Sequence, residues 1–254
     1  MARRLEGKVC LITGTGGSMG REAARLFAKA GARVVGCDID AARAEETLRQ
    51  VRAEGGDMVS LHPLDLAQEA QAADLAAFAL ERYEHIDVLY NNGAAGEFAW
   101  LTDMTPEQWR FTLRNEMDVV FHLTQAVWPH MIAQGGGSII NVGSVSGKIA
   151  YKVLPAVAHS AAKGGVNAMT KHLAMEGGPH RIRVNSISPG LILSDAVRML
   201  MSDPAWAKAM MDKIMLGRPG EPEDVVQTAI FLASDESVWI TGADFAVDGG
   251  TTAW

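Results

Sequence analysis

Short runs of apolar and β-branched residues alternate along this chain with longer stretches in which apolar residues recur every three or four positions. The short runs have the length and composition of buried strands, and the longer stretches have the period of helices that bury one face. This alternation predicts an α/β fold, with a doubly wound parallel sheet of about seven strands and helices on both of its faces. Strands are predicted at residues 8–13, 33–38, 58–63, 88–91, 138–142, 184–188 and 245–247, and helices at residues 20–30, 41–54, 68–83, 106–133, 159–176 and 222–233.

The fourth predicted helix has a clear start. Thr105 can accept a backbone hydrogen bond, Pro106 suits the first helical position, and Gln108 completes a capping box. No repeat, charged tail or low-complexity linker interrupts the series of elements, and 254 residues fit one compact domain. The sequence therefore predicts a single domain over residues 1–254.

Residues 191–215 depart from the alternation. The segment follows a predicted strand end directly, is rich in methionine and is broken by Pro204. Two interpretations are open. One is an amphipathic helix pair that packs on the core, and the other is a flexible flap over an apolar substrate, because methionine adapts to irregular shapes and ligands of such sheets bind beyond the carboxyl ends of the strands.

Composition narrows the classes of partner. A net charge of −7 and a pI near 5.5 disfavour nucleic acid and anionic lipid, which bind basic surfaces. The first apolar run is too short for a signal or membrane helix, so a cytoplasmic protein is expected. Cys10 and Cys37 fall at different heights on two predicted parallel strands, so both are expected to be reduced packing residues. No metal site is expected.

A glycine-rich turn, Thr13-Gly-Thr-Gly-Gly-Ser-Met-Gly20, follows the first predicted strand and opens the first helix. Small residues let the backbone approach a pyrophosphate, whose charge then meets the positive end of the helix. The turn predicts a Rossmann-type dinucleotide site. Its candidate contacts are Gly14, Ser18, Met19 and Gly20.

An acidic residue closes the second predicted strand. The Asp38 carboxylate is placed to accept hydrogen bonds from an adenosine ribose and to repel a 2′-phosphate, and neither Thr15 nor Ile39 supplies a cation to hold one. NAD is therefore the expected cofactor. Asp38 could instead cap the next helix, but Asp40 is better placed to do so.

The segment His159-Ser-Ala-Ala-Lys163 is similar to the Tyr-x-x-x-Lys signature of short-chain dehydrogenases/reductases, with histidine in place of the tyrosine. The glycine-rich turn also matches that family, with Ser18 in place of its middle glycine. Over nearly its whole length the chain resembles this family. Further matches, in order, are Asn91-Asn-Gly-Ala94, Ile140-Asn-Val-Gly-Ser144, Arg183-Val-Asn-Ser-Ile-Ser-Pro-Gly190 and Val247-Asp-Gly-Gly250.

The resemblance implies a role for each matching residue. Ser144 would hold the substrate oxygen, and His159 would stand in for the tyrosine that exchanges the proton. Lys163 would bind the nicotinamide ribose, and Asn115 would anchor a water that leads to solvent. The Ser18 side chain would either crowd the cofactor phosphates or donate a hydrogen bond to them. Besides His159 and Lys163, the implied cofactor contacts include Ile39, Asp65, Leu66, Asn92, Gly93, Pro189, Gly190, Ile192 and Ser194. The resemblance also implies a homotetramer, or a dimer, built from two helices and the last strand.

Histidine changes the expected proton chemistry. Beside Lys163 and a cationic nicotinamide ring, the His159 imidazole is expected to be neutral at pH 7, so that it accepts a proton from an alcohol more readily than it gives one to a ketone. The ring nitrogen lies roughly 2 Å nearer its own backbone than a phenol oxygen would, a gap that a bridging water could close. Tyr151 is the less favoured substitute phenol, because no lysine follows it by four residues.

The leading hypothesis is an NAD-dependent oxidoreductase that oxidises a secondary alcohol of a small to medium apolar compound, or reduces the ketone. Phe98, Trp100, Val153 and Leu154 are candidate walls of the substrate site. One alternative is an NAD-binding sensor or scaffold. Others are an enzyme that uses the imidazole for elimination or another non-redox step, and an ordinary tyrosine enzyme altered at its active site.

Overall fold

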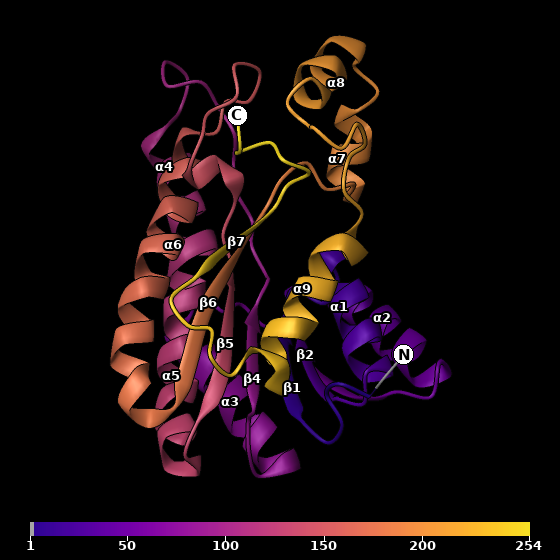
Figure 1. The fold of residues 1–254 in the computed structure, drawn as a ribbon, viewed down its shortest axis with the longest axis vertical. Coiled ribbons are helices and arrows are strands. Elements are labelled where there is room, and N and C mark those ends of the chain that lie inside the picture. The colour runs from indigo at the N-terminus through magenta and orange to yellow at the C-terminus, as the bar shows by residue number, and fades with distance from the viewer. Residues whose placement is uncertain (1–2) are drawn as a thin grey trace.

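The computed structural model describes residues 3–254, and its centre is one sheet of seven parallel strands in the order β3-β2-β1-β4-β5-β6-β7 (Figure 1). Every predicted strand is present, with bounds within two residues of those predicted, which confirms the fold class. The strands are β1 (Val9–Thr13), β2 (Arg33–Cys37), β3 (Asp57–Leu61), β4 (Val88–Asn91), β5 (Gly137–Val142), β6 (Ile182–Pro189) and β7 (Asp244–Val247).

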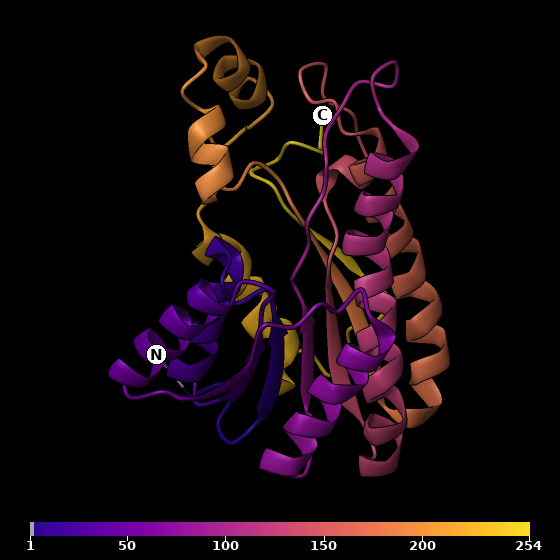
Figure 2. The same cartoon turned by 180° about the vertical axis from the view of Figure 1, so that it is seen from behind.

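Helices cover both faces of the sheet (Figures 1 and 2). One face packs against α1 (Ser18–Lys29), α2 (Ala41–Ala53) and α9 (Pro222–Ala233), and the other against α3 (Glu69–Tyr83), α5 (Val119–Gln134) and α6 (Val157–Gly177). Successive strand residues point to opposite faces, so in β1 Cys10 and Ile12 join one apolar core while Val9 and Leu11 join the other. Within residues 3–254 no helix has the length and apolar character needed to cross a membrane.

The helix predicted over residues 106–133 is present without a break, but it is not α-helical throughout. The chain forms α4 (Pro106–Leu113), a π-helical turn η1 (Arg114–Asp118) and then α5. The predicted capping box is confirmed, because Gln108 N donates to the Thr105 hydroxyl and Thr105 N donates to the Gln108 side chain. A π turn adds one residue without ending the helix, so the apolar period gave no sign of it.

Residues 191–215 form an amphipathic helix pair, α7 (Asp195–Leu200) and α8 (Pro204–Met211), that stands beyond the carboxyl ends of the strands in both views (Figures 1 and 2). Met210 and the following Ile214 are buried in a third apolar cluster with Tyr151. Met199 is 76% exposed, so this pair leaves much apolar surface uncovered.

The two cysteines are free and buried, as predicted. Cys10 pairs with Val34 across the β1–β2 register, whereas Cys37 pairs with Thr13, so the two thiols stand at different heights on neighbouring strands.

Candidate active site

The strand order reverses between β1 and β4, and ligands of open parallel sheets bind in the crevice beyond such a switch point. Hydrogen bonds of the Thr13 and Asn92 side chains connect the loops after these two strands. The Thr13 hydroxyl accepts hydrogen bonds from Asn92 N at 3.0 Å and Gly93 N at 2.7 Å, and the Asn92 amide donates to the Thr13 carbonyl at 2.9 Å. The predicted glycine-rich turn and the Asn92-Gly93 turn therefore share one site.

The glycines of this turn are required by close backbone packing. A Cβ on Gly14, whose φ is +70°, would lie 2.6 Å from Gly93 Cα, and a Cβ on Gly20 would lie 2.0 Å from the Gly14 carbonyl oxygen. The first-turn N–H groups of α1 have no acceptors within the helix, and Asn92 Oδ1 is buried with no hydrogen-bond partner among residues 3–254. A compact loop at a helix N-terminus with free donors fits a dinucleotide pyrophosphate.

Ser18, the departure from the family's glycine, reaches toward the helix pair. Its hydroxyl accepts a hydrogen bond from Asp195 N at 3.3 Å, which links the start of α1 to the start of α7. The neighbouring Ser194 caps α7 by accepting from Val197 N. Gly190 N donates to the Val247 carbonyl, and Ile192 bridges to Gly220, so the loop after Pro189 is held at both sides.

The acids at the other end of the crevice are engaged by backbone and side-chain donors. Asp38 accepts from Gly16 N and from Asp40 N, both at 2.8 Å. Asp40 caps α2 by accepting from Arg43 N, as predicted. Asp65 pairs with Arg114 at 3.1 Å. The adjoining Ile39 is exposed and Leu66 is buried.

His159, on the first turns of α6, is bound by a buried carboxylate. Its Nδ1 lies 2.8 Å from both carboxylate oxygens of Glu116, a residue of the π turn η1. The side chains of His159 and Glu116 are only 16% and 4% exposed. The Phe98 ring packs on the imidazole with its centroid 5.4 Å away. Glu116 was missed from the sequence, because a glutamate 43 positions from the histidine leaves no local pattern.

Lys163 lies one helical turn beyond His159, as predicted, and is buried. Its ammonium donates to the Val142 carbonyl at 3.0 Å. Burial lowers the pKa of Lys163, and the negative charge of Glu116 opposes that shift. The site thus contains a buried lysine and a buried glutamate close to the His159 imidazole.

Asn115 lies in η1, and Ser144 directly precedes a short helical turn at residues 145–147; both of these elements pack against α6. Asn115, beside Glu116 in η1, donates its amide to the Phe111 carbonyl at 2.8 Å, and its own carbonyl accepts from Ala95 N. Ser144 follows β5, and its hydroxyl accepts from Ser146 N at 3.0 Å. The short helical turn after Ser144 and the π turn η1 both contact α6. The structure therefore brings the four predicted catalytic residues to one end of the sheet.

Tyr151, the alternative phenol, lies instead in the apolar cluster beneath the helix pair. Burial raises the pKa of Tyr151, whose hydroxyl lies beside Thr251. Nothing in residues 3–254 pairs this hydroxyl with Lys163, whose ammonium is bound to Val142.

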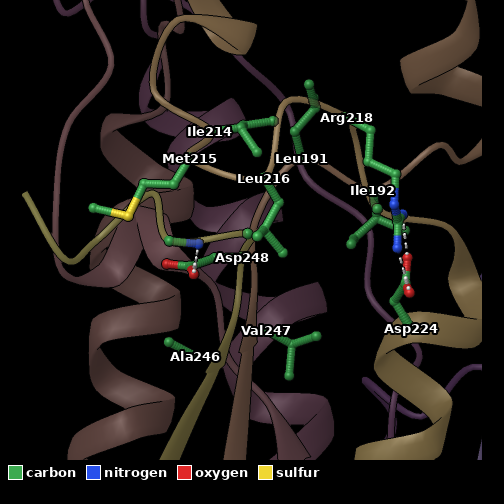
Figure 3. A pocket seen from close by; sticks show the side chains of 13 residues that line it. Leu191, Ile192, Ile214, Met215, Leu216, Arg218, Asp224, Ala246, Val247 and Asp248 are labelled. Atoms are coloured by element: carbon green, nitrogen blue, oxygen red, sulfur yellow. Dashed lines mark hydrogen bonds and ion pairs between the residues drawn. The ribbon is translucent and has the colours of Figure 1, made fainter.

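A separate pocket of about 410 Å³ lies between the end of β7 and the loop that follows α8 (Figure 3). It is lined by the loop around Ile214 and Met215, by Ile192 and by the chain around Asp248, and an ion pair of Arg218 with Asp224 at 2.7 Å stands at its side. Of the predicted catalytic and cofactor contacts, only Ile192 lines it, together with Leu191, Ile214 and Met215 of the predicted flap segment. This pocket is therefore distinct from the His159 site.

Comparison with known proteins gives matches over almost the whole chain. A family profile described as enoyl-(acyl carrier protein) reductase matches residues 14–252. The 3-oxoacyl-[acyl-carrier-protein] reductase FabG of Thermotoga maritima is 38% identical over 248 residues, which are 97% of this chain and 98% of that protein.

Solved structures match equally well. The crystal structure of gox2181 superposes with a TM-score of 0.96 at 32% identity, covering 99% of this chain and 98% of that one. A 7α-hydroxysteroid dehydrogenase in complex with NADH and 7-oxo glycochenodeoxycholic acid has a TM-score of 0.92 at 32% identity, covering 98% and 95% of the two chains. An Agrobacterium tumefaciens protein with bound NADP has a TM-score of 0.89 at 31% identity, covering 99% of each.

Proposed function

The chain belongs to the short-chain dehydrogenase/reductase family, and from this membership we propose that it is an NAD-dependent oxidoreductase that oxidises a secondary alcohol, or reduces the ketone, of a small to medium apolar compound. The observation that carries the proposal is the buried group of His159, Glu116 and Lys163 beside the dinucleotide crevice. We take residues 1–254 as one cofactor-binding domain in which residues 191–215 are the substrate flap.

The proposed roles follow the position of each side chain. Ser144 holds the substrate oxygen, His159 exchanges the hydroxyl proton, and Lys163 binds the nicotinamide ribose after leaving the Val142 carbonyl. Asn115 anchors a water on the path to solvent. The cofactor, when bound, supplies the acceptor for the hydrogen on the alcohol carbon.

In the oxidation, the hydroxyl hydrogen and the hydrogen on the alcohol carbon leave by different routes. The hydroxyl proton would pass to Nε2 of His159, and a bound oxidised nicotinamide would supply the acceptor for the carbon-bound hydrogen and its two electrons. The C–O single bond becomes a carbonyl, and the proton on His159 later passes to solvent. Reduction of the ketone is the same sequence reversed.

NAD is proposed over NADP because Asp38 places a carboxylate where a 2′-phosphate would lie. Its two backbone donors hold this carboxylate at the end of β2. Two cations lie near Gly16: Arg21 donates to the Gly16 carbonyl at 3.1 Å, and Arg43 is paired with Asp40 at 3.5 Å. Since one relative's structure contains NADH and another NADP, the choice needs a direct test.

An apolar substrate is supported by the side chains around the mouth of the site. Phe98 packs on His159, and Val153 and Leu154 lie at the edge of the buried cluster of Tyr151 and Met210. The 7α-hydroxysteroid dehydrogenase among the relatives is named for a hydroxyl on an apolar ring system. A hydroxyl on such a carbon skeleton is therefore the proposed substrate class.

A homotetramer in the cytoplasm completes the proposal. Apolar side chains on α4, α5 and α6 are exposed in the single chain, among them Phe111, Phe121 and Met175 at 41%, 48% and 61%. Such a face is expected to be covered by another copy. Light scattering is expected to give four chain masses, and a monomer would contradict this assembly.

The test is reduction of NAD⁺, followed at the NADH absorbance band, across a panel of cyclic and open-chain secondary alcohols. We expect turnover with an apolar alcohol, a kcat/KM at least about 10²-fold lower with NADP⁺, and loss of that preference in Asp38→Asn. Binding of NAD⁺ without turnover of any alcohol would favour the sensor or scaffold alternative.

A further inference from the structure

We propose that Glu116 is a positioning residue for His159, which fixes the protonated nitrogen of the imidazole and balances the charge that His159 acquires during the reaction. This inference rests on the proposed function, in which His159 exchanges the proton. It concerns a side chain outside the predicted site.

The geometry assigns the tautomer. Both oxygens of Glu116 lie 2.8 Å from Nδ1 of His159, and an ionised carboxylate only accepts hydrogen bonds. Nδ1 therefore carries a hydrogen, and Nε2 is the nitrogen with a free lone pair. Nε2 has no hydrogen-bond partner in residues 3–254, so it is available to a substrate hydroxyl. The arrangement is the one in which a carboxylate orients a histidine base.

The Glu116 carboxylate makes its hydrogen bond to His159 and no other among residues 3–254. A buried carboxylate with a single donor is costly and contributes little to stability. Space for it depends on Gly96, where a Cβ would lie 2.8 Å from Oε1 of Glu116. The π turn η1, which contains Glu116, packs against α6 and so brings the carboxylate toward His159.

The charges explain why a histidine at this position needs such a partner. A proton on Nε2 creates a second cation near the buried Lys163, and like charges at short range oppose each other. Glu116 supplies the opposite charge in direct contact with the ring. The expected bias toward alcohol oxidation was argued from Lys163 and a cationic nicotinamide ring, without the opposite charge of Glu116 in contact with the imidazole.

The reaction step keeps the Nδ1 hydrogen in place. The substrate hydroxyl transfers its proton to Nε2, and the O–H bond breaks as the N–H bond forms. The hydrogen on Nδ1 stays between His159 and Glu116, whose carboxylate remains ionised. No proton is transferred to Glu116, so its contribution is orientation and charge.

The first test observes the imidazole directly in the unmodified protein. Nitrogen NMR of protein labelled with ¹⁵N-histidine, with His159→Phe used to assign the signal, reports which ring nitrogen carries the hydrogen. We expect the Nδ1–H form for His159 in the absence of substrate. An Nε2–H form would overturn the inference without any variant of Glu116.

Kinetics with matched variants form the second test. Glu116→Gln keeps the shape and removes the charge, Glu116→Leu also removes the acceptor, and Glu107→Gln is the control at an exposed glutamate of α4. We expect kcat for alcohol oxidation to fall about 10²-fold in Glu116→Gln with KM little changed. Glu116→Leu is expected to lose the fixed Nδ1–H form as well, while the control matches the wild type.

The outcomes separate this inference from the proposed function. If the wild type oxidises no alcohol, the proposed function fails. If the wild type and His159→Phe are equally active, the roles proposed for His159 and Glu116 both fail. If the wild type is active and His159→Phe is not, but Glu116→Gln matches Glu107→Gln, only the role of Glu116 is overturned.

Discussion

His159 has two ring nitrogens, and each needs a partner of its own, whereas a phenol has a single oxygen. In this site Nδ1 is bound by Glu116 at 2.8 Å, and Nε2 has no hydrogen-bond partner among residues 3–254. Replacing the phenol by an imidazole therefore calls for a second residue that accepts a hydrogen bond from the ring. That acceptor is a buried carboxylate here.

A second buried side chain gives a prediction of stability at the residue scale. The Tyr90 ring stacks on Phe27 with centroids 5.9 Å apart, and its hydroxyl is buried with no partner among residues 3–254. Because an unsatisfied buried hydroxyl is costly, Tyr90→Phe is expected to raise the free energy of unfolding by about 1 kcal/mol in urea titrations.

Tyr83→Phe is the matched control, because the Tyr83 hydroxyl donates to Asp57 at 2.9 Å. This variant is expected to lower the free energy of unfolding by about 1 kcal/mol. Equal destabilisation in both variants would show that the Tyr90 hydroxyl has a partner after all.

The sequence predicted the candidate residues that belong to local patterns and missed the one that does not. Lys163 follows His159 by four residues, and the glycine-rich turn follows a strand, so both were readable. Glu116 meets His159 only after folding, and no spacing rule joins them. An acid next to Asn115 together with a histidine at position 159 was the available signal.

At the scale of elements, the site depends on how η1 and the Ser144 loop pack against α6. The extra residue of the π turn lets the Asn115 carbonyl accept from Ala95 N and turns Glu116 inward. Helical period alone predicts where a helix runs, because it follows the buried face. An inserted residue changes which side chains face α6 and leaves almost no trace in that period.

The contact of the Ser144 loop with α6 gives a prediction for this scale. A Cβ on Gly147 would lie 2.8 Å from Gly164 N and 3.0 Å from the Lys163 carbonyl carbon. These are backbone atoms of α6, so Gly147→Ala must move the loop away from Lys163. We expect kcat/KM to fall at least about 10-fold and unfolding to cost about 1–3 kcal/mol less.

Gly164→Ala is the control on the opposite side of the same contact. Its Cβ would lie 3.6 Å from the Gly147 carbonyl, which is ordinary van der Waals contact. Because alanine favours a helix interior, this variant is expected to gain up to about 1 kcal/mol. If both variants behave alike in urea titration and turnover, the close backbone contact does not position the site.

At the scale of the whole molecule, the alternation of short apolar runs with amphipathic stretches was enough to predict the parallel sheet. The strand order, which reverses between β1 and β4 and brings the loops after these strands together, was not predicted. The helix pair of residues 195–211 stands beyond the carboxyl ends of the strands, where the flap interpretation puts it, but its packing was not predictable. Met210 is its one buried side chain, and it packs in the cluster that contains Tyr151.

Burial of the Cys37 thiol predicts that the free energy of unfolding falls at high pH. Desolvation raises the pKa of Cys37 from 9.0 to about 12. A raised pKa favours folding below the unfolded value, and this contribution is lost as pH rises from 9 toward 12, because the unfolded chain releases the proton first. At pH 10.5 the loss from Cys37 is about 2 kcal/mol.

Denaturant titrations of the wild type and Cys37→Ala at pH 8 and pH 10.5 measure this pH-dependent loss of free energy of unfolding. The variant is expected to lose about 2 kcal/mol less than the wild type over that interval. Identical slopes would mean that the Cys37 thiol is open to solvent in the folded protein.

The most direct measurement of the central claim is kcat/KM for alcohol oxidation with NAD⁺ in the wild type, His159→Phe and His159→Tyr. If His159 is the proton-transfer residue, the phenylalanine variant loses at least about 10²-fold, while NAD⁺ binding is retained. The tyrosine variant is also expected to be slower than the wild type, because its ring meets Glu116 in place of an imidazole. Full activity in His159→Phe, or a large gain in His159→Tyr, would contradict the account.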